Sequence, residues 1–182
     1  MLESDLRLAR ITRISRIIAI LCGVFTVLLP LGLAVYVVGF GDMLAKHPQV
    51  IQMGLTADTL SAMAKAAALG ALLIGTLPAI FMLHNLRRLF ESYAAGTFFT
   101  VCAANRLKAA AVALLAMVVA RPITGALLSL ALSIDLPPGQ KQLVVNFGST
   151  EIWIGLAGGM VLVTAWIMGE AAALAEENRS FV

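Results

Sequence analysis

One arginine stands inside a long apolar segment, and its position is the feature of this sequence that most directly suggests chemistry. Arg121 lies near the middle of the apolar segment 109–134 and is followed directly by Pro122. A charged side chain in such a segment is rare and usually faces the interior of a helical bundle. Arg121 is therefore a candidate to bind an anion or a lipid phosphate, or to pair with Glu170. The alternative is a structural pairing, or a side chain that extends to the membrane surface.

Polar residues also gather in the connection 84–108 and in the closing residues of the chain. Apolar residues recur at helical spacing between Leu86 and Tyr93, which predicts a helix with its charged residues exposed. The acidic end of the chain is either a solvated helix end or a docking tail for a cytoplasmic protein. The candidate partner-facing residues are Arg87, Arg88, Glu91, Gly96, Phe99, Asn105, Glu176 and Glu177.

Motifs typical of enzymes are missing from the sequence. It has no Gly-rich phosphate loop, no Gly-x-Ser-x-Gly, no His-Glu-x-x-His and no paired carboxylates inside an apolar segment. The two histidines, His47 and His84, lie in different connections and do not form a pair of axial haem ligands. We therefore expect no enzyme activity, no cofactor and no metal. Cys22 and Cys102 are expected to be free thiols.

The elements that position these residues follow from composition. The chain is 60% hydrophobic and 13% charged, whereas soluble domains average about 25% charged residues. A helix crosses the hydrocarbon core with about 20 apolar residues. Four segments are long enough, so the sequence predicts an all-α polytopic membrane protein with a single membrane domain, residues 1–182. The predicted spans are 17–40, 66–83, 109–134 and 152–174.

The distribution of Lys and Arg predicts the orientation of these spans. Four arginines precede the first span, and further basic residues occupy the connection 84–108. In the other two connections the basic residues are lysines alone. Basic residues stay preferentially in the cytoplasm, so both termini and the middle connection are expected there. The basic residues do not form the stripe that nucleic-acid binding requires, and we expect no direct contact with nucleic acid.

Local signals predict how the spans are joined. Gly96 is expected to end the helix that continues from the second span, and Thr100 to cap the next one, so that the connection is a cytoplasmic helical hairpin. Thr56 or Asp58 is expected to cap the helix that leads into the second span. Gln49–Met53 and Gln142–Phe147 are short stretches with strand propensity. Pro30 and Pro78 are expected to kink their spans.

Two further interpretations concern span count and helix packing. The halves of the third span on either side of Arg121-Pro122 are each too short to cross, so a re-entrant hairpin with an external C-terminus is an alternative topology. Gly155 and Gly159 form a GxxxG pattern, and Ala71 with Gly75 forms a small-xxx-small pair. Such patterns allow close helix approach, and we favour packing within the chain over a dimer interface.

Two stretches together resemble a known family. Residues 86–107 contain a Gly-x-x-Phe-Thr sequence followed by a basic helix start, and residues 169–182 form an Ala-rich helix that runs into acidic residues and a short apolar end. Both are similar to small bacterial four-span membrane proteins catalogued as domain of unknown function 2975. The positions that match are Gly96, Phe99 and Thr100, with Asn105, Arg106 and Leu107. Arg121-Pro122 does not match the family pattern.

The resemblance implies no known enzyme activity. Members of the family are thought to accompany small helix-turn-helix regulators, which implies a cytoplasmic regulator protein as partner. We therefore expect a protein of the bacterial inner membrane, embedded in the lipid bilayer, that has a regulatory or interaction role. The alternative is a small oligomeric transporter or channel with Arg121 in an anion path, and a homo-oligomer fits either hypothesis.

Overall fold

A computed structural model of the chain describes residues 2–38, 51, 61–98, 100–136, 141 and 143–180. Four long helices and one short 3-10 helix make up the regular elements among these residues. They are α1 (Leu2–Val38), α4 (Ala62–Ala94), α5 (Val101–Leu132), η2 (Ser133–Asp135) and α6 (Ser149–Ser180). The predicted all-α class holds throughout this part of the chain.

The predicted spans 66–83 and 152–174 lie within α4 and α6; the span 109–134 covers α5 and the start of η2, and the span 17–40 lies in α1 as far as residue 38, beyond which the structure does not describe it. The helices contain apolar stretches of 28 to 35 residues that are long enough to cross a membrane, and a helix of that length exceeds the hydrocarbon thickness of about 30 Å. The protein is therefore a multi-pass membrane protein with four candidate crossings. Helix α5 is continuous through Arg121 and Pro122, so the alternative topology with a re-entrant hairpin is wrong.

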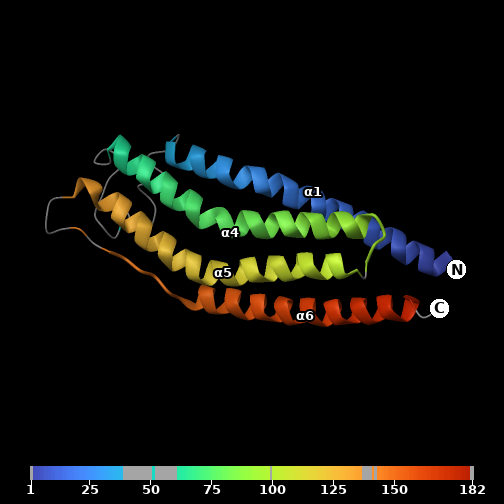
Figure 1. Cartoon of the computed structure of the whole chain (residues 1–182). Helices are drawn as coiled ribbons and strands as arrows, with labels where there is room; N and C mark the ends of the chain where they lie inside the picture. Colours follow the sequence, from blue (N-terminus) through green and yellow to red (C-terminus); the bar gives the residue numbers. More distant parts are fainter. Residues whose placement is uncertain are drawn as a thin grey trace.

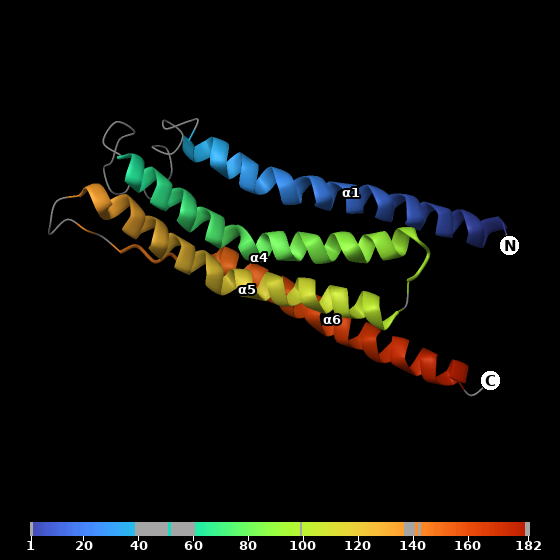
Figure 2. The same ribbon diagram turned by 45° about the horizontal axis from the view of Figure 1, so that its top comes forward.

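The helices lie side by side in the order of the sequence rather than in a closed bundle. Helix α4 packs against α1 on one side and α5 on the other, and α6 packs against α5. Figure 1 shows α1 and α6 at the two edges of this row, and in the view of Figure 2 α6 passes behind α5. Both views also place the two termini and the α4–α5 turn at one end of the molecule, which we call the hairpin end. Helices α4 and α5 bend partway along (Figure 1), and each contains an internal proline, Pro78 or Pro122.

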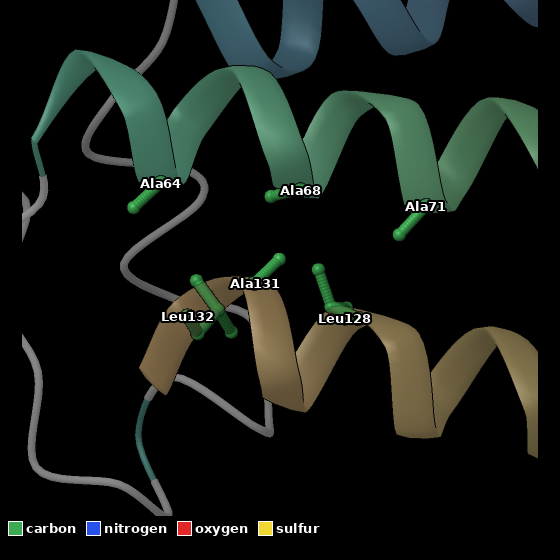
Figure 3. Packing of buried hydrophobic residues seen from close by; sticks show 6 residues of the cluster. All are labelled: Ala64, Ala68, Ala71, Leu128, Ala131 and Leu132. Carbon is green, nitrogen blue, oxygen red and sulfur yellow. The ribbon is translucent and has the colours of Figure 1, made fainter. Parts of the chain in front are cut away.

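The main buried cluster lies between α4 and α5, far from the hairpin end. Three alanines of α4 face Leu128, Ala131 and Leu132 of α5 (Figure 3). Small side chains at a helix interface let the backbones approach closely. The three alanines are Ala64, Ala68 and Ala71.

Glycines extend this close packing along both faces of α5. A Cβ atom at Gly75 would overlap the side chain of Thr124, and one at Gly158 would lie 2.9 Å from Cδ2 of Leu115. Gly155 faces Val118, whereas Gly159 has no neighbour within 4 Å among the described residues. The Ala71–Gly75 pair and Gly155 thus pack inside the chain, as expected.

The α4–α5 turn has the geometry that the sequence predicts. Gly96 has a φ of 81°, the left-handed conformation that glycine adopts most readily. The Thr97 hydroxyl donates to the carbonyl oxygen of Ser92 at 2.8 Å, and the Thr100 hydroxyl caps α5 by accepting from Ala103 N–H at 3.1 Å. The rings of Phe90, Tyr93 and Phe98 pack together across this turn. The two helices are therefore joined by a short turn with hydrogen bonds and ring contacts across it.

Two other local predictions were wrong or fall outside the described residues. Helix α4 begins after Ser61, whose hydroxyl accepts from Ala64 N–H at 3.2 Å, so Ser61 is the cap; Thr56 and Asp58 lie outside the described residues.

Of Gln49–Met53, only Ile51 is described, and it is helical. Residues 143–147 carry no strand and instead run along α5 toward the start of α6 (Figure 1).

Candidate functional site

Arg121 forms an ion pair with Glu151 at the start of α6. Its Nε donates to Glu151 Oε1 at 3.0 Å. The Glu151 side chain is only 7% exposed, whereas that of Arg121 is 49% exposed. A carboxylate buried to this degree needs a charged or hydrogen-bonding partner, and Arg121 supplies one. The pairing that the sequence suggested, with Glu170, is not formed, because α6 places Glu170 far along its length and on its exposed surface.

Glu151 also holds the first turn of α6. Its second oxygen, Oε2, accepts the backbone N–H of Gly148 at 2.8 Å. Gly148 directly precedes Ser149, so Glu151 occupies the third helical position and reaches back to the capping residue. This is one half of a capping box, and a carboxylate here also interacts favourably with the helix dipole. One carboxylate therefore both starts α6 and fixes it to α5.

The pair shows that α6 begins at the level of the middle of α5. Lys108 and Asp135 directly flank the predicted span 109–134. At about 1.5 Å per residue, Arg121 lies roughly 20 Å along the helix axis from each of them. Residues 143–148, rather than α6, lie alongside the part of α5 beyond Arg121. In this contact Val144 N–H donates to the buried Ser129 hydroxyl at 3.1 Å. Non-helical backbone at this depth requires such protein partners, because lipid offers none.

A cavity of about 320 Å³ lies beside the ion pair. Its wall includes Thr76 of α4, Thr124 of α5 and Asn146 of the segment before α6, together with Arg121 and Glu151. The two threonine hydroxyls donate to carbonyl oxygens of their own helices at 2.7 Å. The cavity is thus polar on one side, but its only cation is already paired with a carboxylate.

Three internal prolines fall near this level. The lining of the cavity brings together Leu33, Thr76 and Arg121, which are close in sequence to Pro30, Pro78 and Pro122. Each proline removes one backbone hydrogen bond from its helix. The hydrogen bonding of these helices is therefore locally weakened where α6 begins. At that point the Arg121–Glu151 ion pair connects α5 to α6.

A second set of charged residues lies at the hairpin end. Arg87 Nε donates to Glu91 Oε1 at 2.8 Å along α4, and an exposed pair of this kind contributes little stability. Arg106 of α5 contacts the buried Asn85 of α4, with Nη1 3.4 Å from Oδ1. Asn85 Nδ2 donates in turn to the Phe81 carbonyl oxygen. Arg106 and Asn85 thus join α4 to α5 just before the turn.

A shallow depression covers the outside of the hairpin. We call its lining the hairpin surface: Arg88, Glu91, Ser92, Ala95, Thr97, Cys102 and Arg106. Two arginines and one glutamate give it a net positive charge, and the Cys102 thiol is exposed within it. Such a surface is complementary to an acidic segment of another molecule.

The remaining predicted partner-facing residues are distributed as follows. Gly96 lies in the turn and Asn105 is exposed on the first turns of α5, while Phe99 lies outside the described residues. Glu176 and Glu177 are exposed near the end of α6. Gly169 packs against Ala104, so the last turns of α6 continue past the start of α5, as Figure 2 also shows.

Sequence reasoning missed Glu151 and Asn85. The signal for Glu151 was available, since Gly-Ser-Thr-Glu before an apolar run is a helix-start pattern. No comparable pattern marks Asn85, whose burial depends on how α4 faces α5. In the part of the chain that the structure describes, no three His, Cys, Asp or Glu side chains lie close enough to hold a metal ion.

Comparison with known proteins places most of the chain in one family. A family model described as "Protein of unknown function (DUF2975)" matches residues 56–181. This range includes α4, α5, α6, the Gly-x-x-Phe-Thr stretch and most of the closing segment, while α1 precedes it. No curated protein and no solved structure matches the chain.

Proposed function

The chain belongs to the DUF2975 family of proteins of unknown function, and from this premise we propose that it is a regulatory or interaction protein of the bacterial inner membrane. In this role the hairpin end faces the cytoplasm and docks a soluble protein partner. The observation that carries the proposal is the hairpin surface, a preformed basic depression on a rigid turn.

The construction of the turn supports a binding role. Its backbone is fixed by the Gly96 conformation, the Thr97 and Thr100 hydrogen bonds and the ring cluster around Tyr93. A surface that is already ordered loses little conformational entropy on binding. Arg88 is exposed on this surface, and Arg106, which also contacts Asn85, lines it together with Cys102. We expect the partner to present acidic side chains.

The orientation proposed here follows the basic residues. Arg10, Arg13 and Arg16 of α1 lie toward the same end as the hairpin, because the N-terminus does (Figure 1). Basic residues flanking short connections favour the cytoplasmic side. The basic hairpin surface would then be on the side where soluble regulators are found.

Site-specific photocrosslinking in intact cells tests the proposal. A photoreactive amino acid at Thr97, on the hairpin surface, should give a discrete protein adduct, whereas the same group at the exposed Lys141, on the connection between α5 and α6, should not. Arg88→Glu should remove the Thr97 adduct, and Arg10→Glu, on α1 at the same end, should leave it unchanged. Equal adducts in the Arg88 and Arg10 variants, or none from the unmodified sequence, would overturn the proposal.

An anion path through Arg121 receives less support. The Glu151 carboxylate lies against the guanidinium of Arg121. An entering anion would therefore compete with this carboxylate, which belongs to the protein itself. A transport role would require chloride or phosphate flux in liposomes that Glu151→Gln increases, because that substitution frees the Arg121 charge. Flux that is absent in both forms would exclude this role.

A further inference from the structure

A groove between α1 and α4 combines an apolar wall with a basic end. It has a volume of about 680 Å³ and is lined by α1 from Arg16 to Leu28 and by Arg87, Glu91 and Ala94 of α4. Its apolar part, from Ala19 to Leu28, is about 14 Å long at about 1.5 Å per residue. All but its two basic residues and Glu91 are apolar or glycine, so the groove suits a molecule with one anionic end and an aliphatic body.

The basic end of the groove carries uncompensated positive charge. Glu91 is paired with Arg87 through its Nε at 2.8 Å, which leaves the other nitrogens of that guanidinium available. Among the described residues, no carboxylate contacts Arg16. The lining of the groove therefore has a net charge of about +1.

Gly23 makes room for Arg87 in this groove. A Cβ atom at Gly23 would lie 3.3 Å from Nη1 and 3.5 Å from Cδ and Cζ of Arg87. The guanidinium thus lies directly over the backbone of α1, beside the apolar wall. Arginine donates two parallel hydrogen bonds to phosphate oxygens, which makes it well suited to a phosphate at this position.

We propose that the groove between α1 and α4 binds one anionic phospholipid, with its phosphate between Arg16 and Arg87 and an acyl chain along the face from Val24 to Leu28. The lipid covers a face of α1 that the row-like arrangement leaves open, because α4 is the helix that packs closely against α1 in the described part of the chain. The groove shares Glu91 with the hairpin surface but has different basic residues, since those of the hairpin surface are Arg88 and Arg106.

Native mass spectrometry of the full chain in detergent tests this site. Phosphatidylglycerol and phosphatidylcholine with identical acyl chains are added in turn, and one tightly held phosphatidylglycerol is expected. Arg16→Gln with Arg87→Gln should weaken its binding roughly tenfold or more, because each substitution removes a charge-assisted hydrogen bond to the phosphate. Arg88→Gln with Arg106→Gln is the matched control and should retain the lipid.

A second variant separates charge from shape. Val27→Trp leaves both arginines in place and fills the apolar part of the groove, and it should also lower phosphatidylglycerol binding. Millimolar inorganic phosphate should not displace the lipid, because it lacks the acyl chain. Equal lipid binding in the two double variants, equal binding of both lipids, or displacement by phosphate alone would overturn the proposal. None of these results depends on whether the hairpin surface binds a protein.

Discussion

The guanidinium of Arg121 lies 3.0 Å from a Glu151 carboxylate oxygen, and this contact determines where α6 begins relative to α5. The same carboxylate accepts the Gly148 N–H at 2.8 Å. The ion pair and the helix start therefore share one side chain. Loss of either charge should affect both.

A double-mutant cycle measures this coupling. Arg121→Gln and Glu151→Gln should each lower the thermal midpoint in detergent by several degrees, because each leaves the opposite charge without its ionic partner. The double variant should lose less than the sum, as expected for residues in contact. Trp153 and Trp166, the two tryptophans of the chain, both lie on α6, so tryptophan fluorescence reports this helix. Strictly additive losses would show that the pair is not formed.

Gly75 should tolerate no larger side chain. Gly75→Val must displace Thr124, and overpacking of this kind costs about 1–3 kcal/mol. A change of 1 kcal/mol shifts the midpoint by about 2–4 °C for a chain of this size. Gly70→Val on the same helix meets open space and should change the midpoint little. Similar losses in both variants would place the α4–α5 contact elsewhere.

Neighbouring glycines of α6 should behave in opposite ways. Gly158→Leu would collide with Leu115, whereas Gly159→Leu points into open space in the described part of the chain. We expect the first to lower the thermal midpoint and the second to leave stability and apparent mass on blue-native gels unchanged. A loss of oligomer in the Gly159 variant would indicate that α6 pairs with another copy.

The cap of α5 should contribute measurable stability to the hairpin. Thr100→Ala removes the acceptor of Ala103 N–H and is expected to cost about 1 kcal/mol. Thr164→Ala is a suitable control, since the Thr164 hydroxyl only donates to Met160 within its own helix. Hydrogen exchange of the first turn of α5 should accelerate in the Thr100 variant alone.

The two cysteines of the chain allow a direct test of orientation. Cys102 is exposed at the hairpin end, while Cys22 is buried. If the hairpin faces the cytoplasm, a membrane-impermeant maleimide should label Cys102 in inside-out vesicles but not in intact cells. Cys102→Ser should abolish the labelling of inside-out vesicles. Rapid labelling in intact cells would contradict the proposed topology and place the hairpin end outside the cytoplasm.

The sequence by itself determined the features that depend on local physics. Four apolar segments had to become helices because lipid cannot satisfy backbone polar groups. The Gly96 turn and the Thr100 cap followed from residue types that favour those conformations. The Ala71–Gly75 pair also indicated close packing before the partner helix was known. These signals act over a few residues, so no tertiary information was needed to recognise them.

Only the tertiary structure decided which distant residues meet. Arg121 pairs with Glu151 rather than Glu170 because residues 143–148 run along α5 before α6 begins, and no local pattern specifies that path. Gly23 meets Arg87, and Asn85 meets Arg106, because of how each helix is rotated against its neighbour. All four spans are apolar around much of their circumference, so their periodicity leaves that rotation undefined. Close packing of glycine and alanine against specific side chains fixes it instead.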